Sequence, residues 1–295
     1  MKPPHVRHKV CHSVSLLILY FFFTSVKLQA QVLPPQPDTT AAYFSNAGMG
    51  LPVAAAIATR RRTVLSPVAK GAAVLVAGAG IWVATFAWGD EPLQQYTQSH
   101  RTPTSDALSS VVQPLGKQGY MAPLAGAAFA GGVLLKDEKL QKAGLLSLGS
   151  ILISAGVTGT LKNQFHRYRP SDTGENHYFD GPVHASAHTS LPSAHTATAF
   201  AVATSVAAVY GPEHRCVPPL AYGVATLVGL SRIHDNAHWT TDVMAGAVVG
   251  YLSAKGANYL YDMARLQRRI HKQRRLLIMP QPGIQSGSVS ATLVF

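Results

Sequence analysis

The chain has 295 residues, of which 47% are hydrophobic and 13% charged, so it is too apolar to be disordered and can bury a sizeable core. Its formal net charge of +12 favours an anionic partner, either a substrate or a membrane surface. Nucleic acid is not an expected partner, because the sequence contains no recognisable nucleic-acid-binding motif.

Residues 1–30 have the pattern of a signal peptide. Basic residues come first, an apolar run follows from Ser13 to Val26, and the segment ends at the small residue Ala30. Because this run is short for a membrane span, we expect cleavage after Ala30, with an uncleaved anchor as the alternative. The expected location is therefore the periplasm or cell envelope.

Residues 31–69 are expected to form a leader or linker, because proline is frequent at their start and apolar anchors are few. Apolar segments rich in Ala, Gly and Leu then follow between residues 70 and 262. Their length and composition favour helices, so we predict an all-α bundle of about six core helices, with small residues where the helices meet. The predicted helices are residues 71–88, 122–135, 143–161, 196–211, 216–230 and 243–261.

These helices could lie in water or span a membrane. Basic residues at 60–62, 136–142 and 265–275 flank alternate segments, which fits an integral inner-membrane protein with about six spans. A cleaved signal would reverse that orientation, and the mean hydropathy of +0.13 is low for a protein with many spans. We therefore expect an exported domain, soluble or membrane-associated, and keep the six-span arrangement as the alternative.

Residues 263–295 are expected to contain a basic helix end and a tail of different character. Two β-favouring runs flank a turn rich in Pro, Gly and Ser within residues 276–295. This pattern predicts a short C-terminal β-hairpin. An envelope-anchoring or sorting end is the other interpretation of the tail.

Three polar motifs interrupt the apolar segments. The first, KNQFHRYRP, places Lys162 and Arg169 seven residues apart, on one side of a helix that Pro170 is expected to close. The second, LPSAHTATAF, is typical of a helix start: Ser193 would cap the helix, and its first N–H groups would attract an anion. His195 lies in that first turn, where it could protonate a leaving oxygen.

The third motif, SRIHDNAHWTTD, concentrates charge between two apolar runs. Arg232 adds a third cation, and His238 and Asp242 would share a face if the next helix reaches back to His238. The carboxylate would then fix the imidazole tautomer and leave the other ring nitrogen as base or nucleophile. Each motif alone has an ordinary structural explanation, but the three together predict a phosphate clamp.

The motifs resemble the three-part signature of the type 2 phosphatidic acid phosphatase and vanadium haloperoxidase superfamily, which includes the class A nonspecific acid phosphatases. The matching residues are Lys162-x6-Arg169-Pro170, Pro192-Ser193-Ala194-His195 and Ser231-Arg232-x5-His238-x3-Asp242. The resemblance covers about residues 70–262. The family pattern has Gly where this chain has Ala194, which would be strained at positive φ and harmless in a helix.

The resemblance implies a role for each matching residue. Lys162, Arg169 and Arg232 would hold the phosphoryl oxygens, assisted by Ser193 and the backbone at Ala194. His238 would attack phosphorus, Asp242 would orient His238, and His195 would protonate the leaving group and then activate water.

The implied function is a phosphatase of the cell envelope that forms a phosphohistidine and needs no metal or cofactor. Its expected partners are phosphomonoesters or lipid (pyro)phosphates. Vanadate, which mimics phosphate, would be an inhibitor, or the cofactor in a first alternative, a vanadium-dependent haloperoxidase. The second alternative is a non-catalytic anion-binding envelope protein, which would not require both histidines and Asp242.

Overall fold

The computed structural model describes residues 67–182, 187–273, 275–281 and 288–294. By internal contacts the chain divides into two units, residues 1–77 and 78–295. The predicted signal peptide and most of the predicted leader lie outside the described residues. The elements are α4 (Pro67–Ala84), the π-helix η1 (Thr85–Gly89), α5 (Asp90–Ser99), α6 (Pro103–Val112), the 3-10 helix η2 (Gln113–Gly116), α7 (Gln118–Leu134), α8 (Glu138–Phe165), α9 (Ala194–Tyr210), α10 (Val217–His234), α11 (Thr240–Gln273), β1 (Arg275–Gln281) and β2 (Ser288–Val294).

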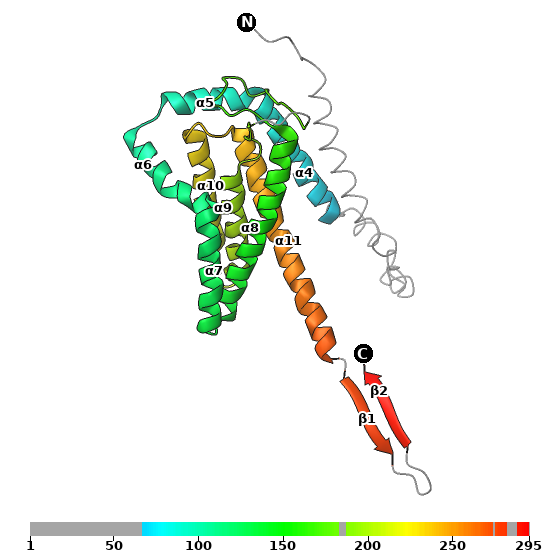
Figure 1. The fold of residues 1–295 in the computed structure, drawn as a ribbon. Helices are drawn as coiled ribbons and strands as arrows, with labels where there is room; N and C mark the ends of the chain where they lie inside the picture. Colours follow the sequence, from blue (N-terminus) through cyan, green and yellow to red (C-terminus); the bar gives the residue numbers. More distant parts are fainter. Residues whose placement is uncertain (1–66, 183–186, 274, 282–287, 295) are drawn as a thin grey trace, which may run out of the picture. The chain divides into compact units, whose positions relative to one another are not determined.

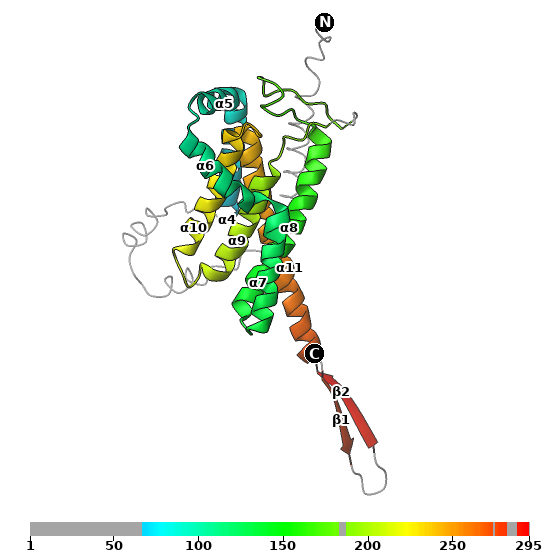
Figure 2. The same ribbon diagram turned by 60° about the vertical axis from the view of Figure 1, so that its left-hand side comes forward.

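The central helix of the second unit is α9. It packs against α8, α10 and α11, while α7 packs on α8 (Figures 1 and 2). The predicted all-α fold is confirmed, because the six long helices of the described residues overlap the six expected segments. The shorter helices α5 and α6 were not predicted, since residues 90–112 contain no long apolar run.

Local chemistry sets the ends of α8. The Asp137 side chain caps its start by accepting hydrogen bonds from the N–H groups of Lys139 and Leu140. The helix ends at Phe165 because His166 adopts a left-handed conformation, with φ of 43°, and donates its N–H to the carbonyl of Lys162. The prediction that Pro170 closes this helix is therefore wrong, and Arg169 lies outside the helix.

Glycines allow α11 to lie very close to α9. A Cβ atom added at Gly246 would lie 2.5 Å from the carbonyl oxygen of Ser193. One turn later, a Cβ added at Gly250 would collide with the carbonyl oxygen of Ala197. Small residues therefore bring the two backbones together at this interface, as the composition of the segments predicted.

The bundle places small polar side chains inside and large apolar side chains outside. Its buried positions are mostly Ala, Ser and Thr, including Ser150, Ser154, Thr196 and Thr198, all 0% exposed. On α10, by contrast, Leu220, Val224, Leu227 and Leu230 form an exposed stripe along one face. Similar exposed apolar residues occur on α7, α8 and α11. This distribution is the reverse of the one expected for a helical bundle in water.

Within the described residues, two helical stretches are long and apolar enough to cross a membrane, judged by length and composition alone. They are Gly71–Ser99 and Glu138–Phe165. In the most apolar 18 residues of the second stretch, 39% are buried in the bundle, so part of its apolar character serves the protein interior.

The C-terminal strands confirm the predicted hairpin. β1 and β2 pair in antiparallel fashion, with Arg275 opposite Val294 and Gln281 opposite Ser288. α11 runs without a break to Gln273, so the expected boundary at residues 262/263 lies within a helix.

Gly250→Ala should destabilise the protein by about 1–3 kcal/mol, because the added methyl group forces α9 and α11 apart. Gly256→Ala is the matched control, since nothing lies within 4 Å of a Cβ there. We expect it to be neutral or to stabilise by up to about 1 kcal/mol through helix propensity. Thermal unfolding of the two purified variants checks this, and equal midpoints would contradict the close approach.

Candidate active site

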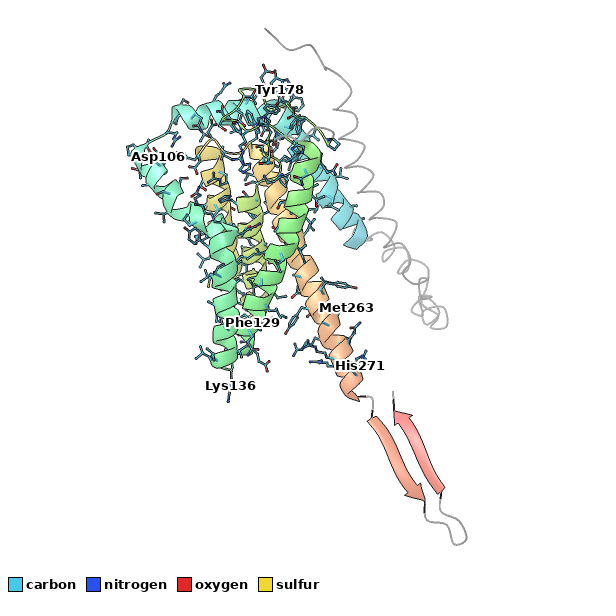
Figure 3. All side chains as sticks on the ribbon, in the orientation of Figure 1. Asp106, Phe129, Lys136, Tyr178, Met263 and His271 are labelled. Atoms are coloured by element: carbon cyan, nitrogen blue, oxygen red, sulfur yellow. The ribbon has the colours of Figure 1, made fainter. Side chains whose placement is uncertain are left out.

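The three motifs meet at one end of the bundle, where α8 and α10 end and α9 and α11 begin (Figure 1). In Figure 3, Tyr178 marks this end, and Lys136, in the turn between α7 and α8, marks the opposite end. Since every motif lies at a helix terminus, the chain brings them together by alternating the direction of successive helices.

The first motif places its two predicted phosphate-binding cations on different structural elements. Lys162 is in the last turn of α8, and its ammonium group donates to the carbonyl of Thr189. Arg169 lies in the segment that follows the helix. Trp239 Nε1 anchors this segment by donating to the carbonyl of Tyr168 at 3.0 Å, which holds Arg169 beside the third motif.

The second motif forms the start of α9 as predicted. Ser193 is the N-cap residue, and its hydroxyl accepts a hydrogen bond from the N–H of Thr196. Ala194 is the first residue of the helix and is not among the described residues with positive φ, so alanine causes no backbone strain here. His195 follows it, and burial, together with the nearby charges of Arg232, His238 and Lys162, lowers the pKa of its imidazole to about 4.

Arg232 is held at the end of α10 by Asp235, a residue of the same motif. Its Nη1 donates to Asp235 Oδ2 at 2.8 Å, and Asp235 Oδ1 accepts from Ser109 on α6 at 2.6 Å. His234 instead contacts Asp106, with 2.7 Å between Nε2 and Oδ1. Asp235 thus positions a phosphate-binding candidate, a role that the sequence pattern alone did not indicate.

His238 and Asp242 lie together, although not as residues of one helix. α11 begins at Thr240, so the condition that the helix includes His238 is not met. His238 Nδ1 nevertheless faces Asp242 Oδ2 at 3.7 Å, because the chain turns just before the helix. Ser190 Oγ lies 3.5 Å from the same nitrogen and donates to Asp242 Oδ2 at 2.5 Å.

Burial and charge set the protonation state of His238. Its side chain is 5% exposed, and loss of water contact lowers the pKa of its imidazole to about 4. Asp242 opposes this shift, whereas Lys162 and Arg169 add to it. His238 is therefore a neutral imidazole at physiological pH, the form that can act as a nucleophile.

Two buried donor groups of the site have no hydrogen-bond partner in the described part of the protein. They are Nε2 of His195 and Nε of Arg232. Buried polar atoms are normally hydrogen-bonded, and both of these lie among the other cations of the site. They are suited to bind the oxygen atoms of a phosphoryl group.

Sequence reasoning missed a set of buried residues behind these groups. Arg167, Asp90 and Ser190 contact Asp242 directly or through one another. Arg167 is one of three cations in KNQFHRYRP, but a sequence does not show which of them points inward. Asp90 lies far upstream of all three motifs, so no spacing pattern could have linked it to them.

The arrangement supplies the parts needed for phosphoryl transfer. A neutral histidine beside a carboxylate can attack phosphorus, three cations can hold its oxygens, and a second histidine can protonate a leaving group. No group of three His, Cys, Asp or Glu side chains in the described ranges could hold a metal ion.

Comparisons with known proteins agree with this geometry. Residues 143–266 match the family described as the PAP2 superfamily. The lipid A 1-phosphatase of Porphyromonas gingivalis is 37% identical over 117 residues, which are 40% of this chain and 23% of that protein. The chain therefore matches only about a quarter of the length of this curated relative.

The fold also resembles solved structures. A transmembrane PAP2-type phosphatidylglycerolphosphate phosphatase from Bacillus subtilis superposes with a TM-score of 0.52 and 21% identity, over 65% of this chain and 96% of that one. Aquifex aeolicus LpxE gives a TM-score of 0.45 and 22% identity, over 58% of this chain and 94% of that one. The segment that carries the three motifs is thus the segment that matches the PAP2 superfamily, as the resemblance of the motifs implied.

Proposed function

We propose that the protein is a lipid phosphatase that hydrolyses a phosphate monoester of a phosphorylated lipid through a phosphohistidine intermediate. The observation that carries this proposal is the pairing of His238 Nδ1 with Asp242 beside three cations and a second histidine. The phosphatidylglycerolphosphate and lipid A phosphatases to which the chain is similar support a lipid substrate.

In the first step, Lys162, Arg169 and Arg232 hold the phosphoryl oxygens while Nε2 of His238 attacks phosphorus. Asp242 accepts the hydrogen bond from Nδ1–H, so the imidazole keeps the tautomer in which Nε2 carries the lone pair. His195 gives its proton to the leaving oxygen as the phosphorus–oxygen bond breaks. In the second step, His195 takes a proton from water, which attacks phosphorus and releases phosphate and free His238. Vanadate is expected to inhibit by occupying the phosphate position.

His238→Ala should abolish phosphate release, because the variant lacks the imidazole nitrogen on which the phosphorus–nitrogen bond is proposed to form. His271→Ala is the matched control: His271 is exposed near the end of α11, away from the motifs (Figure 3). Phosphate release from a phosphorylated lipid in detergent micelles, with EDTA present, is the measurement. Wild-type turnover by His238→Ala, or no turnover by the wild-type chain, would contradict the proposal.

The acid limb of kcat/KM should lie near pH 4, well below the usual range for histidine. The pKa of His238 is lowered to about 4 by burial, so the nucleophile stays neutral until the pH falls to that value. Below it, the rate should fall about tenfold per pH unit; above it, the rate should fall as His195, whose pKa is also lowered to about 4, loses the proton that it gives to the leaving group. The profile is corrected for ionisation of the substrate, and activity after return to neutral pH excludes denaturation. An acid limb near pH 6.5 would show that His238 is not shifted.

We further propose that the bundle is embedded in a membrane, with its active site at the outer surface. The exposed apolar stripes on α7, α8, α10 and α11 suit contact with lipid, and the interior packs through small residues. Basic side chains gather at the end opposite the site. They are Lys136, Lys139, Lys142, Arg215, Arg265, Arg268 and Arg269. This proposal takes up the six-span alternative rather than the exported domain.

Cys216, which is exposed in the connection between α9 and α10, reports this orientation directly. A membrane-impermeant maleimide should label it only after the cells are made permeable. Glu175→Cys, made with Cys11 and Cys216 replaced by serine, should be labelled in intact cells, because residue 175 is exposed at the site end. Labelling of both positions from outside would contradict the embedded arrangement.

A further inference from the structure

A buried ion cluster lies directly behind His238, and Arg167 is its centre. Its Nη1 donates to Asp242 Oδ1 at 2.5 Å, and its Nη2 donates to Asp90 Oδ2 at 2.8 Å. All three side chains are 0% exposed. Two carboxylates and one guanidinium carry a net charge of −1 next to the catalytic histidine.

The remaining donors of Arg167 are also used. Nε and Nη2 donate to the carbonyl of Asn176 at 3.1 and 2.9 Å, and Nη1 donates to the hydroxyl of Thr241 at 2.8 Å. Aromatic rings surround the guanidinium, whose centre lies 5.2 to 5.7 Å from the rings of Phe86, Phe179 and Trp239. A group with this many fixed contacts has a single orientation.

Because Arg167 binds one carboxylate oxygen of Asp242, the two oxygens have different partners. Oδ1 is occupied by the guanidinium, so Oδ2 is the oxygen that faces Nδ1 of His238. Oδ2 also accepts hydrogen bonds from Ser190 Oγ at 2.5 Å and from the N–H of Trp239 at 3.0 Å. With both oxygens held, the carboxylate cannot rotate away from the imidazole.

Asp90, which precedes all three motifs in the sequence, binds the Nη2 side of the Arg167 guanidinium. Its Oδ2 also accepts from the Thr241 hydroxyl at 2.5 Å, and its Oδ1 accepts from the N–H of Thr241 at 2.9 Å. The carboxylate of Asp90 therefore locks both Arg167 and the backbone beside Asp242. Replacement of a buried ion cluster by apolar residues is often neutral or stabilising, so stability alone does not account for it.

We propose that Arg167, clamped by Asp90, is a positioning residue for the phosphoryl transfer. It holds Asp242 in the orientation that keeps Nδ1 of His238 protonated and directs Nε2 at phosphorus. The net negative charge of the cluster also stabilises the positive charge that develops on the imidazole as the phosphorus–nitrogen bond forms. This inference rests on the proposed phosphatase function.

Arg167→Lys tests the proposal, because lysine keeps the positive charge but lacks the planar guanidinium group that binds two carboxylates at once. We expect kcat to fall about 10–100-fold, the loss typical of a group that orients a ligand or catalytic residue. KM should change less than about threefold, since the cations that bind phosphate stay in place. Arg101→Lys is the matched control, an exposed ion-pair arginine outside the site, and should keep wild-type kcat.

A double-mutant cycle with Asp242→Asn separates positioning from a purely structural role. If Arg167 acts through the carboxylate of Asp242, its replacement in the Asp242→Asn background should lower kcat by less than about threefold further. The proposal would be overturned if the loss of kcat in the double variant equalled the product of the losses in the two single variants. Wild-type kcat in Arg167→Lys would also overturn it. If Arg167→Lys shows no unfolding transition, Asp90→Asn, which frees one side of the clamp, replaces it in the same cycle.

Failure of the proposed function would look different. In that case the wild-type chain would release no phosphate, or His238→Ala would remain active, whatever the Arg167 variants do. An active wild-type chain and an inactive His238→Ala variant, combined with multiplicative losses for Arg167 and Asp242, would overturn the positioning role alone.

Discussion

Asp242 is the residue at which the three motifs are joined. Its backbone carbonyl accepts the N–H of Ser193, which ties the start of α11 to the start of α9. Its carboxylate binds Arg167, from the segment after α8, and faces His238, which precedes α11. Because all these contacts are buried, movement of any one of these segments would leave a charged or polar group without its partner, at a high energetic cost.

The close approach of α9 and α11 makes this junction geometrically feasible. Gly246 and Gly250 allow the backbones to touch, and the first of these contacts is with the carbonyl of Ser193, the cap of α9. Packing and chemistry are therefore linked: the residues that let the helices approach also set the distance between the second and third motifs. A rigid bundle is needed because the charged groups lie on separate helix ends.

The bundle also explains how such a polar site is compatible with so apolar a chain. Charged groups collect at the two ends, with the reactive cluster at one and the lysine- and arginine-rich turns at the other. Between the ends, the interior is held by Ala, Ser and Thr, and the large apolar side chains face outward. An apolar exterior of this kind suits an apolar medium, as the proposed membrane embedding requires.

The sequence by itself determined the helical class, the six long segments, the C-terminal hairpin and the residues of the three motifs. These features are local: apolar run length, capping residues and fixed spacing are properties of short stretches of chain. Only the tertiary structure decided that α8 ends at Phe165, that His238 lies outside α11, and that Arg167 is buried against Asp242. The partnership of Asp90 with Arg167 could not be predicted either, because it joins residues 77 positions apart. Such contacts depend on where the packed helices place their ends, and no local pattern encodes that.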